Sequence, residues 1–222
     1  MEIDFINQLH NSTKRDYLER VNDKEYPKHI AAKLAKKFDF DYWDGDRRIC
    51  YGGYKYIPGR WTPVAKKLID FYKLDKKSSI LDVGCGKGFL LYEIKKLIPD
   101  IQICGLDISK YAIDNSKEEI KEFLVNGSAT KMPFPDKSFD LVFSFNTLHN
   151  LYCNDLYLSL KEINRISKKN SYICVESYKN EEEKANLLYW QVTCESFYTP
   201  KEWAWWFDLV SYKGDYSFIY FN

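Results

Sequence analysis

The chain has 222 residues, of which 45% are hydrophobic and 17% aromatic, so its composition excludes a disordered protein and its length suits one domain with an added segment. Its 33 basic and 32 acidic side chains nearly balance, which argues against a surface that binds a nucleic-acid backbone. The opening residues carry no signal-peptide pattern and the sequence holds no apolar run of membrane-spanning length, so we expect a cytoplasmic protein without a membrane partner.

Residues 1–63 differ in pattern from the rest of the chain. The stretches "KRDYLERV" and "PKHIAAKLAKKF" predict short helices, whereas residues 39–63 are polar, aromatic and without a clear period. A long irregular segment beside a compact domain is typical of a lid or a binding loop, and its many Tyr, Trp and Arg residues argue against disorder. We therefore expect residues 1–63 to form a lid that contributes to a substrate pocket, and residues 64–222 to form the core.

From about residue 64 onward, predicted strands alternate with predicted helices. This alternation implies right-handed crossover connections between parallel strands, and so a mostly parallel sheet with helices on both faces. The fold class that follows is α/β, a three-layer sandwich. In chain order the pattern predicts strands over residues 78–83, 101–108, 139–148 and 171–178, with helices over 88–98, 110–123 and 156–168 between them.

The end of the chain predicts one more helix and a closing strand. Thr199 and Glu202 have the spacing of a capping box, and Pro200 occupies the first position of the helix that follows. The stretch "DYSFIYF", residues 215–221, is typical of a strand. We expect this strand to lie antiparallel at or near the edge of the sheet.

Six cysteines lie far apart in the chain. They form no C-x-x-C pair, and several sit in strand-like apolar runs, a pattern typical of buried free thiols. We therefore expect neither a structural zinc site nor any other metal.

Glycines follow the first predicted strand of the core, in "LDVGCGKGFL". Gly84, Gly86 and Gly88 allow a tight turn against which a ligand can lie, at the end of the sheet where open α/β folds bind ligands. Asp107 ends the second strand, where a carboxylate accepts hydrogen bonds from a ribose diol. The spacing G-x-G-x-G differs from the G-x-G-x-x-G pattern of dinucleotide-binding sites. Asp82, just before the turn, favours a ligand with an amino group over one with a pyrophosphate.

The stretches "ILDVGCGKG", "ICGLDIS" and "GSATKMPFPDKSFDLVFSFNTLHNL" resemble the ordered motifs of class I S-adenosylmethionine-dependent methyltransferases, over about residues 64–222. The resemblance implies a Rossmann-like fold and S-adenosyl-L-methionine as cofactor. It also implies that Asp82, Gly84 and Gly86 line the methionine end of this cofactor, and that Asp107 holds its ribose hydroxyls.

The resemblance further implies how the adenine and the sulfonium lie. The turn of Gly127, Ser128 and Ala129 flanks the adenine, and Asn146 at the end of a strand lies near the sulfonium. The family often has Asp at the position of Ser128. We therefore expect the Ser128 hydroxyl or the neighbouring backbone to hold the adenine amino group.

Arg60 directly precedes the first helix of the core, which begins near Pro63. Its planar guanidinium suits the methionine carboxylate of the cofactor or an anionic substrate, and a salt bridge between segment and core is the alternative. The aromatic residues Tyr51, Tyr54, Tyr56 and Trp61 either cover the cofactor or, as we favour for each, belong to the core. The predicted cofactor-binding residues are Arg60, Asp82, Gly84, Gly86, Gly88, Asp107, Ile108, Ser128, Ala129 and Asn146.

Candidates for catalysis follow from what methyl transfer requires, namely alignment of the acceptor and removal of its proton. His149 lies just past a core strand, where it either removes a proton or serves as a packing or capping residue. Glu176, inside an apolar strand, either binds a polar or cationic substrate or pairs with an arginine of the N-terminal segment. Tyr178 nearby is a hydrogen-bond donor for the acceptor. His10 and His29 fall on presumed surface helices and are predicted to be bystanders.

We therefore expect an enzyme that transfers a methyl group to an oxygen or nitrogen atom of a small polar metabolite, and no nucleic-acid partner. The flanks "YGGYKYIPGRWTPVAK" and "CESFYTPKEW" are also similar, more weakly, to small bacterial methyltransferases of surface-polysaccharide biosynthesis, which implies a precursor or substituent of such a polysaccharide as substrate. The alternatives are a nicotinamide-dependent oxidoreductase on the same fold class and a cofactor-binding protein without catalysis.

Overall fold

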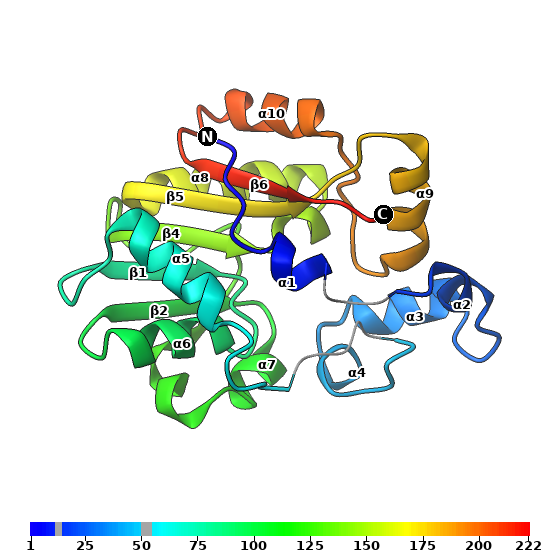
Figure 1. Ribbon diagram of the computed structural model, residues 1–222, viewed down its shortest axis with the longest axis horizontal. Coiled ribbons are helices and arrows are strands. Elements are labelled where there is room, and N and C mark those ends of the chain that lie inside the picture. The colour runs from blue at the N-terminus through cyan, green and yellow to red at the C-terminus, as the bar shows by residue number, and fades with distance from the viewer. Residues whose placement is uncertain (12–14, 50–54) are drawn as a thin grey trace.

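A computed structural model describes residues 1–11, 15–49 and 55–222 and shows a six-stranded sheet between two layers of helices (Figure 1). The strands lie in the order β3-β2-β1-β4-β5-β6, and each pairing between neighbours is parallel. This arrangement confirms the predicted three-layer α/β sandwich. The strands are β1 (Ser79–Val83), β2 (Gln102–Asp107), β3 (Leu124–Asn126), β4 (Phe139–Phe145), β5 (Ser167–Glu176) and β6 (Asp215–Ile219).

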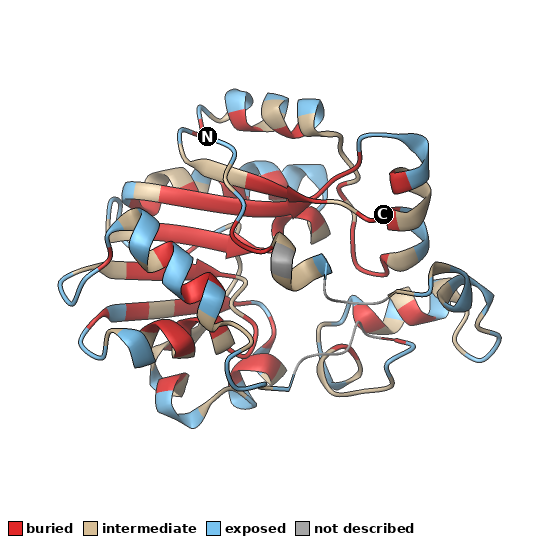
Figure 2. Ribbon diagram, in the orientation of Figure 1, coloured by how far each residue is buried: buried red, intermediate tan, exposed pale blue. Residues whose placement is uncertain are grey.

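The central strands are buried on both faces because helices cover both sides of the sheet. Ile80, Leu81 and Val83 of β1 are fully buried, and Figure 2 shows β4 and β5 buried along most of their lengths. Apolar runs of this kind carried the strand predictions. Two strands differ in length from their predictions. β4, predicted over residues 139–148, stops at Phe145 because Asn146 turns the chain with a φ of 54°. β5, predicted over residues 171–178, runs from Ser167 to Glu176.

Four helices supply much of the packing on the two faces of the sheet. α5 (Thr62–Tyr72) and α6 (Phe89–Leu97) cover one face, and α8 (Cys153–Ile166) and α10 (Pro200–Leu209) cover the other. Trp203 of α10 is fully buried against the sheet. The capping box predicted for α10 is present and fixes where this helix begins.

The helix predicted over residues 110–123 consists of two shorter elements. α7 (Lys110–Asp114) is followed by the 3₁₀ helix η1 (Glu118–Phe123), and then by β3, a short strand that the sequence did not predict. Asn115 and Ser116 lie between them, and such side chains compete with the helix for backbone hydrogen bonds. A second 3₁₀ helix, η2 (Leu148–Asn150), follows β4.

The last strand, β6, runs parallel to β5, so the antiparallel orientation expected for it is wrong. The connection between these strands contains α10 and, before it, α9 (Glu181–Trp190). A crossover with two helices is long enough to return the chain to the starting end of the sheet, as a parallel strand requires. The sequence did not predict α9 because its apolar residues do not form a stripe along one side of the helix.

The chain begins beside β6 before it leaves the sheet. The backbone N–H of Ile3 donates to the carbonyl of Tyr216 at 2.8 Å, and the N–H of Tyr216 donates to the carbonyl of Met1 at 3.0 Å. Phe5 and Ile6 are buried in the core. The first residues of the predicted lid segment therefore extend the sheet.

Four short helices follow in the N-terminal segment, and two of them confirm the helices predicted there. In Figure 1, α2, α3 and α4 lie together beyond the carboxyl ends of the strands, next to α9. α3 packs through Ala31 and Ala35 against Tyr42 of α4. The helices are α1 (Asn7–Asn11), α2 (Tyr17–Asn22), α3 (Lys28–Ala35) and α4 (Phe40–Trp43).

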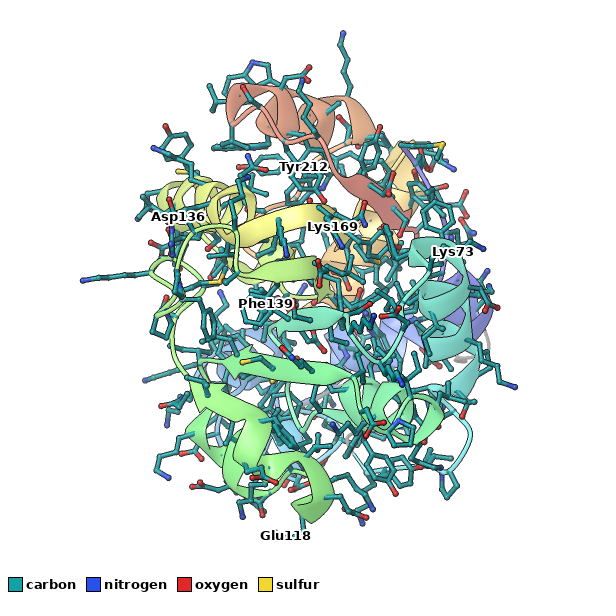
Figure 3. The ribbon with its side chains drawn as sticks, turned by 90° about the vertical axis from the view of Figure 1, so that its left-hand side faces the viewer. Lys73, Glu118, Asp136, Phe139, Lys169 and Tyr212 are labelled. Carbon is teal, nitrogen blue, oxygen red and sulfur yellow. The ribbon has the colours of Figure 1, made fainter. Side chains whose placement is uncertain are left out.

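The opposite end of the sheet, where the strands begin, faces the viewer in Figure 3 and carries ion pairs that involve β4, β5 and α8. Lys169 lies 2.9 Å from Asp140, and Arg165 lies 2.7 Å from Asp136. Pairs this exposed each contribute little to stability. Within the described ranges, no helix is long and apolar enough to cross a membrane.

The cysteines described by the structure are free thiols. Cys174 and Cys194 are buried as expected, whereas Cys153 is exposed at the start of α8. Cys50 lies outside the described residues. No group of metal-binding side chains occurs among the residues that the structure describes.

Candidate active site

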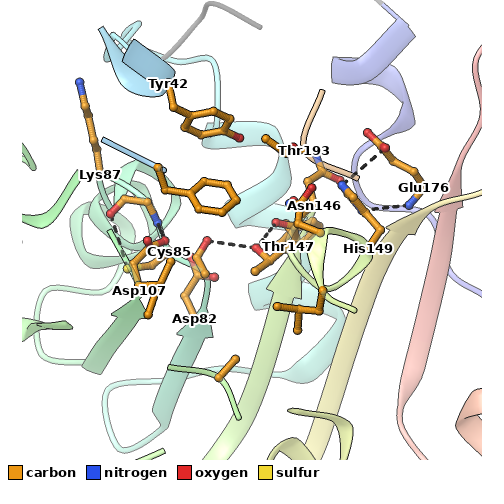
Figure 4. Close-up of a pocket in the computed structure, with 18 of the residues that line it drawn as sticks. Tyr42, Asp82, Cys85, Lys87, Asp107, Asn146, Thr147, His149, Glu176 and Thr193 are labelled. Atoms are coloured by element: carbon orange, nitrogen blue, oxygen red, sulfur yellow. Dashed lines mark hydrogen bonds and ion pairs between the residues drawn. The ribbon is translucent and has the colours of Figure 1, made fainter. Parts of the chain in front are cut away.

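A cavity of about 700 Å³ lies beyond the carboxyl ends of the central strands, under the N-terminal helices (Figure 4). Ligands bind at this place in open α/β sheets, where the strand order reverses between β1 and β4. We call its two parts the glycine end, around Gly84 and Gly86, and the glutamate end, around His149 and Glu176. The predicted site residues that line the cavity are Arg60, Asp82, Gly84, Gly86, Asp107, Ile108, Ser128, Ala129, Asn146, His149 and Glu176.

Gly88 and Tyr178 are not among the described residues that line the cavity. A Cβ on Gly88 would lie 2.4 Å from Cδ1 of Ile120, so this glycine allows α6 to pack closely against its neighbours. The Tyr178 ring is buried in the core, 5.3 Å from Nζ of Lys184. Their positions therefore do not support a role in cofactor binding for Gly88 or in catalysis for Tyr178.

The turn after β1 takes its shape from Gly84 and Gly86. Their φ angles of 80° and 55° lie in the left-handed region that favours glycine. A Cβ on Gly84 would lie 2.1 Å from Oγ1 of Thr147, and a Cβ on Gly86 would lie 2.6 Å from the Trp43 ring. Side chains are therefore excluded at both positions, and the backbone itself forms the wall of the cavity.

Two buried carboxyl groups face the glycine end. Oδ2 of Asp107 accepts a hydrogen bond from the N–H of Gly86 at 2.7 Å, and its Oδ1 accepts one from Ser109 at 2.8 Å. Each carboxylate oxygen has a further lone pair for a ligand hydroxyl. Burial raises the pKa of Asp107, and it raises the pKa of Asp82 well above its usual range, with a further contribution from the Asp107 charge.

The predicted adenine turn lies beside Ile108, which is 60% exposed and lines the cavity. Oγ of Ser128 lies 2.8 Å from Oγ1 of Thr130 and accepts a hydrogen bond from the Thr130 N–H at 3.2 Å. Thr130 also lines the cavity and was not predicted from the sequence. The Ser128 hydroxyl therefore shapes this turn as well as facing the cavity.

Asn146 connects the two ends of the cavity. Its N–H donates to the carbonyl of Cys174 at 3.0 Å, and this bond holds it beside β5. Its φ of 54° is unusual for a residue other than glycine, although asparagine tolerates it better than most. Backbone strain of this kind often occurs at functional sites.

The N-terminal segment is attached to the glycine end by polar contacts. Nζ of Lys87 lies 2.7 and 2.8 Å from the two carboxylate oxygens of Asp44, and the Tyr111 hydroxyl donates to the same carboxylate at 2.9 Å. Nε1 of Trp43 donates to Oγ of Ser109 at 2.8 Å. Trp43 therefore lines this end of the cavity, and Asp44 holds the same segment against Lys87.

The sequence did not predict these contacts, because residues 39–63 show no period from which to place a side chain. One residue that could have indicated them is Lys87, inside the glycine turn. Its side chain is 6% exposed, and a buried ammonium group requires an anionic partner. A search for that partner in the aromatic segment would have pointed to an aspartate such as Asp44.

The glutamate end brings together side chains from distant parts of the chain. Nε2 of Gln191, after α9, donates to Oε1 of Glu176 at the end of β5. Nε2 of His149, in η2, lies 3.5 Å from Oε2 of Glu176. Burial raises the pKa of Glu176 to about 8 and lowers the pKa of His149 to about 3. Both groups are therefore largely uncharged at neutral pH.

Comparison with known proteins agrees with this geometry. Residues 74–211, more than half of the chain, match the family described as Methyltransferase domain. The chain belongs to this methyltransferase family.

Two curated relatives carry methyltransferase names. An uncharacterised methyltransferase of Schizosaccharomyces pombe is 33% identical over 111 residues, which cover 45% of this chain and 39% of the relative. A malonyl-(acyl-carrier protein) O-methyltransferase of Legionella pneumophila is 36% identical over 95 residues, which cover 41% of this chain and 33% of the relative. The match therefore spans less than half of the length of these relatives.

The fold has a counterpart among solved structures. The YcgJ protein of Bacillus subtilis aligns with a TM-score of 0.54 and 19% identity, over 66% of each chain. This likeness agrees with the Rossmann-like arrangement of the strands.

Other predicted residues of the methyltransferase occupy different places. Trp61 lines the cavity, whereas the Tyr56 hydroxyl donates to Glu93 on α6. Tyr51 and Tyr54 lie outside the described residues. His10, which was predicted to be a bystander on a surface helix, lines the cavity.

Arg15 accompanies His10 at the glutamate end. Its Nη2 lies 3.1 Å from Nδ1 of His10, and burial lowers the pKa of that imidazole to about 4. Both residues come from the N-terminal segment, which thus contributes a cation to this end of the cavity. His29, on α3, is exposed, as predicted.

Proposed function

We propose that the protein is an S-adenosylmethionine-dependent methyltransferase that acts on an oxygen or nitrogen atom of a small polar metabolite. The observation that carries this proposal is the continuity of the cavity. It joins a glycine turn with two buried carboxyl groups, Asp82 and Asp107, to a second compartment around Glu176. A cofactor at one end and an acceptor at the other would meet near Asn146.

The residues at the glycine end fit this cofactor. The free lone pairs of Asp107 suit a pair of ribose hydroxyls, and the bare backbone at Gly84 and Gly86 leaves space for a ligand. Asp82 suits the amino group of the methionine part, and Arg60 suits its carboxylate. When bound, S-adenosylmethionine supplies a methyl group activated by a positively charged sulfur.

The N-terminal segment supports a small acceptor. Trp43 lines the cavity and Asp44 ties the same segment to Lys87 of the glycine turn, and enclosure by such a segment excludes water and aligns the acceptor with the methyl group. The balanced net charge argues against a nucleic-acid substrate. The most specific form of the proposal is a precursor of a surface polysaccharide, which rests on the resemblance of the flanking sequences. A cytoplasmic location remains a prediction.

Calorimetric titration with S-adenosylhomocysteine and with NADH tests the proposal and its oxidoreductase alternative. We expect S-adenosylhomocysteine to bind with one site per chain and to raise the melting temperature, and NADH to do neither. Binding of NADH without binding of S-adenosylhomocysteine would contradict the proposal. Consumption of S-adenosylmethionine in the presence of an acceptor then distinguishes an enzyme from a cofactor-binding protein.

A further inference from the structure

The carboxyl group of Glu176 is held at one oxygen and open at the other. Oε1 accepts a hydrogen bond from Gln191. Oε2 is buried and accepts no hydrogen bond from the residues that the structure describes, although Glu176 lines the cavity. A buried carboxyl oxygen without a hydrogen bond is unfavourable. A donor group on a ligand in the cavity would remove this cost.

His149 is oriented by two contacts with Glu176. The backbone N–H of Glu176 points to Nδ1 of His149 at 3.3 Å, and Nε2 lies 3.5 Å from Oε2. An N–H group can only donate, so Nδ1 is the unprotonated nitrogen and the neutral ring carries its proton on Nε2. The N–H of His149 therefore faces the carboxyl group.

This arrangement leaves His149 unsuited to proton removal. The lone pair on Nδ1 is directed at a backbone donor of β5, and Nε2 already carries a proton. Burial also lowers the pKa of the ring to about 3, which makes it a weak base. The sequence suggested His149 as the proton acceptor, whereas its geometry suits the orientation of a neighbouring carboxyl group.

We propose that Glu176 receives the proton of a hydroxyl group on the methyl acceptor, and that His149 is the positioning residue that holds the Glu176 carboxyl group. The inference rests on the proposed methyltransferase function. The acceptor oxygen forms a bond to the methyl carbon while the carbon–sulfur bond breaks and its electron pair stays on sulfur. The hydroxyl proton moves to Oε2 of Glu176 and then to water. The products are the O-methylated acceptor, S-adenosylhomocysteine and a proton.

The charge at the glutamate end favours a hydroxyl compound over an ammonium compound. The guanidinium of Arg15 lies 5.5 Å from the Trp190 ring and 5.2 Å from the Phe221 ring, and its charge acts on Glu176. Arginine stays charged at any pH of interest. The positive charge of Arg15 would repel a protonated amine, and such an amine would also have to lose its proton before attack. The acceptor is therefore a neutral or anionic molecule, and the aromatic walls suit one with a ring.

Several groups act on the ionisation of Glu176. Burial has the largest effect and raises its pKa to about 8, whereas the charge of Arg15 and the hydrogen bond from Gln191 lower it. The nearby thiols of Cys174 and Cys194 have pKa values raised by burial and stay neutral at that pH. Once ionised, such a carboxylate is a stronger base than an ordinary glutamate. Methyl transfer should therefore increase as the pH rises toward 8.

A titration that needs no acceptor tests the role of His149. Carbon-13 NMR of protein labelled at glutamate carboxyl carbons follows Glu176, with Glu176→Gln to assign its signal. We expect a midpoint near 8 in the wild type and in the control His29→Phe. In His149→Phe the midpoint should rise, since the carboxylate loses the neighbouring N–H. A midpoint near 4.5, or the same midpoint in His149→Phe as in the wild type, would overturn the positioning role.

Transfer of a labelled methyl group tests the role of Glu176. The wild type and Glu176→Gln receive methyl-labelled S-adenosylmethionine with equimolar 4-hydroxyphenylacetate, glucuronate and phenethylamine. We expect label on a hydroxyl oxygen, a rate about 10²- to 10⁴-fold lower in Glu176→Gln, and equal affinity of both proteins for S-adenosylhomocysteine. Equal rates, label on the amine, or no transfer by a wild type that binds S-adenosylhomocysteine would overturn the inference. Loss of that binding in both proteins would instead contradict the proposed function.

Discussion

The two ends of the cavity are built in different ways. The glycine end comes from residues that directly follow β1 and β2, and its carboxylate Asp107 is held at both oxygens by backbone N–H groups. The glutamate end combines Arg15, His149 and Glu176 with Gln191, which come from four separate parts of the chain. There, Oε2 of Glu176 accepts no hydrogen bond from any described residue.

This difference separates a binding surface from a reactive one. A carboxylate that accepts two backbone hydrogen bonds has a fixed orientation and serves to hold a ligand. A buried carboxyl group with an open oxygen and a pKa near 8 is suited to gain and lose a proton. Substitutions at the glycine end should therefore change affinity, and substitutions at the glutamate end should change rate and pH dependence.

The largest effect on affinity is expected for Asp107→Ala. The change removes a charged acceptor from two ligand hydroxyls and from the N–H groups of Gly86 and Ser109, a loss of about 1.5 to 3 kcal/mol. Binding of S-adenosylhomocysteine, measured by calorimetry, should weaken at least tenfold. Asp114→Ala, on the exposed side of α7, is the matched control and should bind as the wild type does. Unchanged affinity in a folded Asp107→Ala protein would refute the assignment of the glycine end.

The next effect concerns stability at alkaline pH. The folded protein holds the Glu176 proton up to about pH 8, whereas an unfolded chain releases it near 4.5. Stability that depends on this carboxyl group is therefore complete below pH 4.5 and is lost as the pH rises toward 8. His149 adds an opposite slope below pH 6.5, so we use the window from pH 6.5 to 8 and compare the wild type with Glu176→Gln, which isolates the contribution of Glu176.

Denaturant unfolding of the wild type and Glu176→Gln at pH 6.5 and 8 measures this difference. We expect the wild type to lose at least about 1.4 kcal/mol relative to Glu176→Gln across the window, the value of one pKa unit. Parallel changes in the two proteins would mean that Glu176 already ionises at neutral pH. The contrast between the two ends of the cavity would then be smaller than we infer.

A smaller effect is expected where the N-terminal segment joins the glycine end. Asp44→Ala removes the anion that pairs with the buried Lys87 and accepts from Tyr111. S-adenosylhomocysteine should leave about three- to tenfold faster in stopped-flow experiments, because the cover over its site is held less firmly. Asp46→Ala, which breaks an exposed pair with Arg48 in the same segment, provides the control. Equal release rates in all three proteins would show that this cover does not retain the ligand.

The smallest effect on function is expected at the start of α10, a helix with no described residue in the lining of the cavity. Thr199→Ala removes the capping box of α10 and should lower the free energy of unfolding by about 1 kcal/mol. Affinity for S-adenosylhomocysteine should not change. A change in that affinity would show that α10 is coupled to the site. Substitutions at the glycine end and at the glutamate end would then not have independent effects.

Much of the fold could be predicted because it depends on local patterns. The apolar runs of the central strands, the capping box at Thr199 and the glycines after β1 each act over a few residues. Asp107 could be located because its distance from the glycine turn is set by one βαβ unit. The direction of β6 could not, since it depends on where the crossover through α9 and α10 returns the chain.

The sequence by itself determined the layered fold, the glycine turn and Asp107, because spacing along the chain places these features. Only the tertiary structure decided which side chains share the glutamate end and what each can do there. The proton on His149, in η2, is assigned by the backbone N–H of Glu176 at the end of β5. The pKa of Glu176 depends on burial by surrounding elements and on Arg15. Such contacts join residues far apart in the chain, and no local pattern encodes them.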